Sequence, residues 1–471
     1  MRQRIQFSMK VFFRAMLAAT LAFSIVGAQE PAPPGPDFSK LARTIVLELA
    51  TGQFGAAEAQ FDAAMSQALP EAKLAQTWGS LVAQFGALKA IHDVRVVPQQ
   101  KFWVAYVNCQ FEKAALDAKI VFTFDAKISG LFFVPPGQAG EAENAPPPEW
   151  TAPPYSIANS FRESPITVTD MHWELPGTMT APAGNGRFPA VVLVAGSGPH
   201  DQDETIGPNK PFKDLAWGLA SRGIVVLRYT KRTAKYGMKS TNDPNALTVN
   251  DEVIDDARSA VAFAAQQKNV DPRRIYLLGH SLGAYLAPRI ASGDSEIAGI
   301  ILMAGNFRPT EQLIVEQVRY LTGRSGAISP EAQKQIDAAE QVQREIENPN
   351  LKPGTMIDIF GSQMPSSYWL DLRGYDPGKV AAGLRIPILI LQGEKDYQVR
   401  VADFEGWKKA LAGHSNALFK IYPSLNHLFM VSMAAGEQLS TPSDYKKFGH
   451  VSPDVVEDIA AWISSPGPIS K

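Results

Sequence analysis

The sequence predicts an α/β fold with a mostly parallel sheet, preceded by a smaller α+β domain. From Ser160 onward, short apolar strands alternate with helical stretches. This alternation indicates parallel strands whose connecting helices cover both faces of one sheet. Before that point, residues 38–87 have apolar side chains at helical spacing and residues 89–135 switch to period two. Helices followed by a strand meander indicate a separate small domain.

The small α+β domain is expected over residues 38–138. Its strands are predicted by alternating apolar runs at 94–97, 103–107, 120–124 and 128–134. Cys109, the only cysteine, lies in such a run, so we expect a buried thiol and no internal disulfide. The segment has no cluster of His, Asp or Glu, and an accessory role without its own catalysis is expected.

The larger domain is expected over residues 160–471. An antiparallel hairpin at 166–181 should be followed by strands at 188–195, 224–229, 274–279, 297–303, 386–391 and 418–422. Helices are expected at 211–221, 249–267, 282–292, 401–412 and 453–464.

The stretch between the strands at 297–303 and 386–391 is much longer than a crossover needs. It predicts a helical cap insertion at about 306–383, with amphipathic helices at 310–323 and 329–347. Tyr368 and Trp369 are candidate walls of a substrate pocket beneath it. A packed insertion without substrate contact is the alternative.

The N-terminus has the pattern of an export signal. Residues 1–28 contain basic side chains, the apolar run from Ala15 to Val26, and small residues before Gln29. The run is shorter than the roughly 20 residues of a spanning helix. We therefore expect a cleaved signal peptide, a secreted or periplasmic protein without stable membrane insertion, and proline-rich segments at 29–37 (spacer) and 139–159 (linker). An uncleaved membrane anchor is the alternative.

Charge and composition exclude several classes of partner. The formal net charge is −2 with both signs interspersed, which argues against nucleic acid and anionic membrane surfaces. No cluster of His, Cys or carboxylates has the spacing of metal ligands, so neither a metal nor an organic cofactor is expected. The pattern does not indicate an oligomeric state.

A G-x-S-x-G turn follows the predicted strand at 274–279. Gly279, Ser281 and Gly283 lie where a strand turns abruptly into a helix. Such a turn projects the serine hydroxyl at the sheet edge and leaves no room for side chains at its glycines. Ser281 is therefore the candidate nucleophile, although a structural turn serine is the plain alternative. His280, beside it, is expected to pack against or shape this turn and the pocket.

A serine nucleophile needs a base that is oriented by a carboxylate. In a fold with this kind of serine turn, the chain order is serine, acid and then histidine. Asp396 follows the buried-type strand at 386–391, with Glu394 as the competing carboxylate. His427 follows the last predicted strand and is the candidate base, whereas His414 lies before that strand.

An oxyanion hole requires two amide N–H groups aimed at the developing negative charge. Leu282 N–H, directly after the nucleophile, is the first candidate. The second is expected in the glycine-rich loop after the strand at 188–195, with Ser197 N–H favoured and Gly198 next. A simple tight turn is the alternative for this loop. The basic run from Lys231 to Lys239 is expected to be a solvated loop.

With these motifs in place, residues 160–465 resemble bacterial α/β-hydrolases of the carboxylesterase and acyl-peptidase-like group. Relatives have a Gly-Ser-Gly-Pro loop leading into Asp-Arg-Asp-Glu, and a Leu-Arg-Tyr-Asp-Lys-Arg-Thr run. Here Gln202 replaces the arginine of the first motif and Thr230 the aspartate of the second. The small domain resembles a domain of unknown function, of the DUF3887 type, that precedes secreted hydrolases, and a nuclear-transport-factor-2-like cone.

The resemblance implies a serine hydrolase that acts on small acyl or aryl esters through a Ser-His-Asp triad and an acyl-enzyme. A serine exopeptidase or amidase with the same mechanism is the first alternative. A binding protein on a hydrolase fold is the second, and an intact Ser, Asp and His in the right order argues against it.

Overall fold

The computed structural model describes residues 37–62, 65–66, 69–99, 102–123, 125–134, 150–324, 326, 328–360 and 362–465. These residues form two compact units, one up to residue 134 and one from Trp150, and each is described by itself. The predicted signal peptide, nearly all of the spacer and most of the linker lie outside the described residues.

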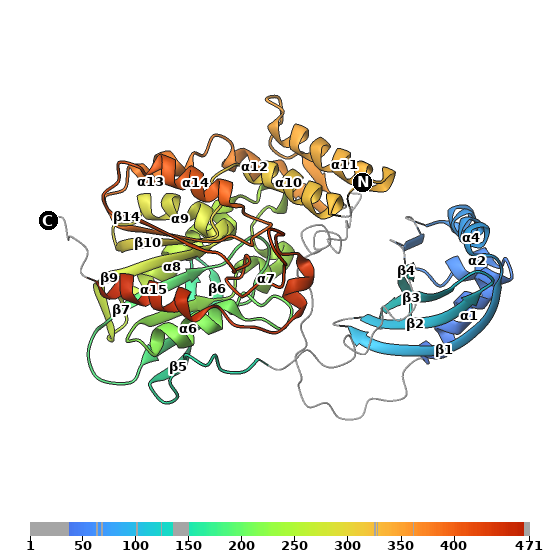
Figure 1. Ribbon diagram of the computed structural model, residues 1–471, viewed down its shortest axis with the longest axis horizontal. Coiled ribbons are helices and arrows are strands. Elements are labelled where there is room, and N and C mark those ends of the chain that lie inside the picture. The colour runs from blue at the N-terminus through green and yellow to red at the C-terminus, as the bar shows by residue number, and fades with distance from the viewer. Residues whose placement is uncertain are drawn as a thin grey trace, which may run out of the picture. The chain divides into compact units, whose positions relative to one another are not determined.

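The first unit is a four-stranded antiparallel sheet with helices packed on it (Figure 1). Ile45, Val46 and Leu49 form the buried face of the first helix and share one core with Phe111 and Phe122 of the sheet. The elements are α1 (Phe38–Ala50), α2 (Phe54–Glu58), α4 (Glu71–Phe85), β1 (Leu88–Gln99), β2 (Phe102–Phe111), β3 (Ala115–Thr123) and β4 (Ile128–Val134). The Cys109 thiol is buried in this core, and burial raises its pKa to about 12.

The second unit is built on an eight-stranded sheet in the order β14-β13-β10-β9-β7-β8-β6-β5. Strands β7, β8, β9, β10, β13 and β14 run parallel, and β5 and β6 add an antiparallel hairpin at one edge. The strands are β5 (Phe161–Asp170), β6 (Trp173–Pro182), β7 (Phe188–Val194), β8 (Val225–Tyr229), β9 (Val270–His280), β10 (Ile297–Met303), β13 (Ile388–Gly393) and β14 (Ala417–Tyr422). Every parallel strand overlaps a predicted one.

Helices cover both faces of this sheet, as the unbroken apolar runs of the central strands require (Figure 1). Helices α6 (Pro211–Ala220) and α15 (Pro453–Ser464) pack on one face. Helices α8 (Asp255–Ala265), α9 (Leu282–Ser292) and α14 (Val401–Ala410) pack on the other. The predicted helix at 249–267 begins with a π turn, Asn250–Ile254, before α8.

The segment between β10 and β13 contains two longer helices followed by a small hairpin. Its elements are α10 (Thr310–Gly323), α11 (Pro330–Glu347), β11 (Met356–Ile359), β12 (Ser362–Pro365), α12 (Ser366–Leu372) and α13 (Pro377–Ala382). The two long helices match the predicted ones, whereas the hairpin of β11 and β12 was not predicted. Within the described ranges, no helix has the length and apolar character needed to cross a bilayer.

Candidate active site

Ser281 lies at a sharp turn between β9 and α9, at the carboxyl edge of the parallel sheet. Its backbone has φ 53° and ψ −117°, a conformation that non-glycine residues rarely adopt. Its N–H donates to the Met303 carbonyl at 2.9 Å, which ties the turn to the end of β10. Strained backbone of this kind is retained where the surroundings enforce it, and it often marks functional positions.

The glycines of the motif are required by close backbone contacts. A Cβ at Gly279 would lie 2.2 Å from the Gly283 carbonyl oxygen. A Cβ at Gly283 would lie 2.2 Å from the Val194 carbonyl oxygen, at the end of the neighbouring β7. Helix α9 therefore begins directly against the end of β7, which brings Ser281 close to the loop that follows that strand.

His427 and Asp396 meet at the same edge of the sheet. His427 Nδ1 is 2.6 Å from Asp396 Oδ2, and both side chains are buried. A bond from Nδ1–H to the carboxylate leaves Nε2 as the ring nitrogen that can take a proton. The two residues follow β14 and β13, which pair in parallel and therefore end side by side. Asp396, the predicted acid, is thus the carboxylate that contacts the His427 ring, and the roles of the two residues as acid and base stay predictions.

The loop after β13 holds the Asp396 carboxylate in one orientation. Oδ1 accepts from the backbone N–H of Gln398 at 2.7 Å and of Val399 at 3.1 Å. Oδ2 faces His427 and also accepts from Gln392 Nε2 at 3.3 Å. The competing carboxylate, Glu394, is half-buried and makes no hydrogen bond to His427 in the described structure. His414, the alternative candidate for the base, has its Nε2 2.7 Å from the Leu384 carbonyl oxygen instead.

The glycine-rich loop after β7 is held through its carbonyl groups. Gly196 C=O accepts from Lys231 Nζ at 2.8 Å, and Ser197 C=O is 2.8 Å from His200 Nε2. In a trans peptide the N–H points opposite to the C=O of the same plane. The Ser197 and Gly198 N–H groups are therefore directed away from Lys231 and His200.

The candidate oxyanion donors lie on two adjoining segments. Gly196 packs directly on the nucleophile, because a Cβ built on it would lie 3.1 Å from the Ser281 Cβ. The N–H of Leu282 is at the first position of α9, where no intrahelical acceptor exists. These two segments meet beside Ser281, as an oxyanion hole requires, and the role of their amides stays a prediction.

His280 is buried between two loops, and its part in a substrate pocket stays a prediction. Its Nδ1 lies 3.0 Å from Glu204 Oε1, and its Nε2 lies 2.9 Å from the His427 carbonyl oxygen. Glu204 also accepts from Gly196 N–H at 2.7 Å. Sequence reasoning placed His280 at the turn but missed Glu204, although Glu204 belongs to the motif that carries the family resemblance.

The prediction of a solvated loop from Lys231 to Lys239 is wrong for its first two residues, which are buried. Lys231 is 3% exposed and pairs with Glu252 at 2.7 Å, while Arg232 is buried against Asp170 and Asp256. A buried lysine requires a carboxylate partner, and Glu252 is distant in sequence, so local pattern could not show it.

Tyr368 and Trp369, the predicted pocket walls, are both buried on α12. Tyr368 Oη donates to Glu252 Oε2 at 2.7 Å, so it joins the network that holds Lys231 and the Gly196 carbonyl. Trp369 belongs to the main core of the unit. Their contact with substrate stays a prediction.

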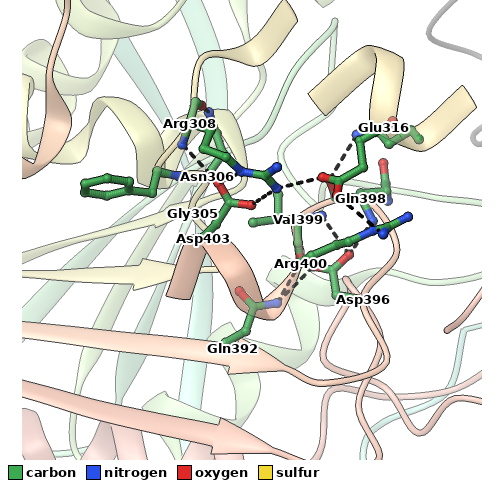
Figure 2. A network of polar contacts seen from close by, with 12 residues as sticks. Gly305, Asn306, Arg308, Glu316, Gln392, Asp396, Gln398, Val399, Arg400 and Asp403 are labelled. Atoms are coloured by element: carbon green, nitrogen blue, oxygen red, sulfur yellow. Dashed lines mark hydrogen bonds and ion pairs between the residues drawn. The ribbon is translucent and has the colours of Figure 1, made fainter. Parts of the chain in front are cut away.

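The inserted helix α10 is attached to the loop that carries Asp396 (Figure 2). Arg400 pairs with Glu316 of α10 at 3.3 Å, and Gln317 Nε2 donates to the Gln398 carbonyl at 3.1 Å. Glu316 also pairs with Arg308, whose guanidinium binds Asp403 of α14 at 2.6 Å. Figure 2 shows these ion pairs as one chain that ends at Arg400, four residues after Asp396 in the same loop.

Comparisons with known proteins agree with this architecture. Residues 42–131 match a family model described as "Protein of unknown function (DUF3887)", and residues 210–432 match "Serine aminopeptidase, S33". The curated esterase EstD of Thermotoga maritima is 39% identical over 390 residues, which cover 83% of this chain and 86% of EstD. The chain belongs to the family of esterase EstD. It is a hydrolase with an α/β-hydrolase fold and an N-terminal domain of the DUF3887 type.

Solved structures that are similar to this chain include a hyperthermophilic esterase from Pyrobaculum calidifontis and Est1E from Butyrivibrio proteoclasticus. The first is 17% identical with a TM-score of 0.40 and covers 64% of this chain and 85% of its own. The second is 15% identical with a TM-score of 0.41 and covers 64% of this chain and 99% of its own.

No group of three or more His, Cys, Asp or Glu side chains in the described ranges is arranged to hold a metal ion. The polar groups around Ser281 are instead paired with one another, as carboxylate with imidazole and as lysine with carboxylate. The chemistry that these residues offer is proton transfer and anion stabilisation.

Proposed function

We propose that this member of the EstD family hydrolyses small acyl or aryl esters through Ser281, His427 and Asp396. Ser281 Oγ attacks the ester carbonyl carbon while His427 Nε2 takes the hydroxyl proton. Asp396 holds the imidazole by Nδ1–H and stabilises the imidazolium that forms. The amides of Leu282 and of Ser197, with Gly198 as the next donor, bind the oxyanion.

The tetrahedral intermediate then collapses with cleavage of the bond to the leaving alcohol. The imidazolium of His427 gives its proton to the departing oxygen, which leaves an acyl-enzyme on Ser281. Water attacks the acyl carbon with His427 again as base, and the second collapse releases the carboxylic acid and restores the serine. Protons balance over the two halves, so no cofactor is required.

The observation that carries this proposal is the 2.6 Å contact of His427 with Asp396 at the sheet edge where Ser281 is held with positive φ. A histidine with a buried carboxylate on Nδ1 and its other nitrogen free is the arrangement of a general base. The relationship to EstD supports an ester as the bond that is cleaved.

The test compares initial rates on p-nitrophenyl acetate and butyrate with rates on aminoacyl-p-nitroanilides. We expect ester turnover that Ser281→Ala abolishes and that Ser292→Ala, a control at the end of the same helix, leaves unchanged. A fluorophosphonate probe should label the wild type and not Ser281→Ala. Equal ester rates with and without the Ser281 hydroxyl would overturn the mechanism.

An exopeptidase or amidase is the second candidate, and the match to the serine aminopeptidase model favours it. The mechanism would be the same, with an amine as leaving group. Faster turnover of the anilides than of the esters would replace the esterase proposal by this one.

We also propose that the protein is exported and cleaved before Gln29. N-terminal sequencing of protein recovered from the periplasm or the medium of a bacterial host should begin at or near Gln29. Retention of Met1 on the recovered protein would contradict the cleavage.

A further inference from the structure

His280 is surrounded by acceptors on both ring nitrogens. Nδ1 faces the Glu204 carboxyl at 3.0 Å and Nε2 faces the His427 carbonyl oxygen at 2.9 Å. A carbonyl oxygen only accepts, and an ionised carboxylate only accepts. A neutral imidazole has one N–H, so it would leave one of these contacts without a proton. An additional proton is therefore held within the pair of His280 and Glu204.

The surroundings favour placing that proton on the imidazole. Imidazole binds a proton about two pKa units more tightly than a carboxyl group does in water. Glu204 also accepts from Gly196 N–H, and a bond from an N–H stabilises the ionised form of a carboxyl. Burial, the largest single effect, would lower the pKa of His280, but Glu204, the His427 carbonyl and Asp396 together outweigh burial and raise it. Burial would likewise raise the pKa of Glu204, but His280, His200 and the Gly196 N–H together outweigh that effect and lower it.

This pair connects three loops of the site. Glu204 binds Gly196, which precedes Ser197 in the glycine-rich loop after β7. His280 ends β9 and directly precedes Ser281. Its Nε2–H fixes the backbone of His427 in the loop after β14. The oxyanion loop, the nucleophile and the general base are thus linked through one buried ion pair.

We propose that Glu204 and His280 form an ion pair that positions the oxyanion loop and His427, and whose imidazolium keeps His427 neutral as a base. Neither residue contacts the reacting atoms, so both are positioning residues. The proposal rests on the esterase function proposed for Ser281 and His427. It adds a charge to the surroundings of the base.

The electrostatic effect follows from the order of the groups. The His280 and His427 ring centroids are 4.7 Å apart, and Glu204 binds the side of His280 that is turned away from the His427 carbonyl. A nearby like charge disfavours a second imidazolium on His427. The other charged or titratable groups that face this cluster are Asp396 from the loop after β13, Lys231 from the loop after β8, and His200 from the loop after β7.

Glu204→Gln separates the charge from the hydrogen bonds. The glutamine Oε1 can still accept from Gly196 N–H. The glutamine Nε2 would take the place of Glu204 Oε2, which also lies 3.0 Å from His280 Nδ1, and it can donate to that nitrogen. His280 then needs only the one proton on Nε2 that it donates to the His427 carbonyl. A donor and an acceptor therefore remain available to His280 and Gly196, while both charges of the pair disappear.

The first measurement uses the full chain labelled with ¹⁵N-histidine, and His280→Gln assigns the His280 signals among the seven histidines. We expect both His280 ring nitrogens to remain protonated at pH 8 in the wild type, and only one in Glu204→Gln. A wild-type His280 with a single protonated nitrogen at pH 7 would overturn the proposal. This result does not depend on any variant being active.

The second measurement is the pH profile of kcat/KM on p-nitrophenyl butyrate. In Glu204→Gln the acidic limb, which reports the base in the free enzyme, should move up by about one pH unit. Thermal unfolding should stay close to that of the wild type, and the exposed Glu296→Gln should keep the wild-type profile. An unmoved acidic limb in folded Glu204→Gln would overturn the proposal. Failure of the proposed function would instead appear as ester turnover that survives Ser281→Ala.

Discussion

Asp396→Asn tests the candidate triad with little change in shape. Asp396 Oδ1 accepts two backbone N–H groups, from Gln398 and Val399, so an asparagine should keep its oxygen at that position. Its amide NH₂ then faces His427 Nδ1, where the carboxylate oxygen was. A donor at this place requires Nδ1 to be the acceptor, which moves the ring proton to Nε2. The imidazole then cannot take the proton from Ser281.

The magnitude follows from the loss of the correct tautomer. A histidine held in the wrong tautomer lowers kcat by about 10⁴ in serine hydrolases. At 1.36 kcal/mol for each factor of ten, this is about 5 kcal/mol of transition-state stabilisation. The new NH₂ also faces Gln392 Nε2, which is 3.3 Å from Oδ2, so the unfolding free energy should fall by about 1–3 kcal/mol.

The assay is the rate of p-nitrophenyl butyrate hydrolysis and the second-order rate of fluorophosphonate labelling, with thermal unfolding on the same samples. We expect both rates to fall together in folded Asp396→Asn. The control is Glu394→Gln, a carboxylate two residues away that does not bond His427, and it should stay within about threefold of wild type. Rates within tenfold of wild type for Asp396→Asn, with a large loss for Glu394→Gln, would refute the assignment of the acid.

Three further predictions concern stability. Gly283→Ala would place a Cβ 2.2 Å from the Val194 carbonyl oxygen, so the free energy of unfolding measured with denaturant should fall by about 3 kcal/mol. The control is Gly323→Ala, whose Cβ would meet no atom within 4 Å, and its free energy of unfolding should change by no more than about 0.5 kcal/mol. Arg232→Met leaves the buried Asp170 and Asp256 without their cation and should cost about 3–5 kcal/mol, whereas the same change at the exposed Arg273 should cost almost nothing; equal losses would contradict the ion-pair account. Burial alone would raise the pKa of the Asp203 carboxyl, but Arg228 and Lys210 outweigh burial and lower it. Its contribution should therefore be present above about pH 4 and be lost as pH falls further, and urea unfolding of Asp203→Asn should depend less on pH over this acidic range than that of the wild type.

The sheet and the places of the candidate triad were predictable because they depend on local pattern. Strand β13 is an unbroken apolar run that ends in a polar turn, and the chain order alone placed Asp396 and His427 at one sheet edge. The need for glycine at positions 279 and 283 was equally predictable, because the close contacts that exclude a side chain there involve only the turn itself and one neighbouring strand.

What could not be predicted depends on contacts between distant residues. Lys231 and Arg232 appeared to belong to a solvated basic run, but their carboxylate partners lie 21 to 62 residues away in the sequence. Glu204 and His280 are 76 residues apart in the sequence, and the residues around each of them do not indicate the contact. The hairpin of β11 and β12 consists of four-residue strands, too short for an alternating pattern to be recognised.

The attachment of α10 to the loop after β13 matters for anyone who wishes to change the substrate range by exchanging the insertion. Tyr320 stacks on Tyr397 with ring centroids 5.9 Å apart, and Glu316 pairs with Arg400. A foreign insertion without these side chains would leave a guanidinium and an aromatic ring uncovered beside Asp396. A chimaera should therefore transfer residues 397–400 together with the insertion, because these residues join the inserted helix to the loop that carries Asp396.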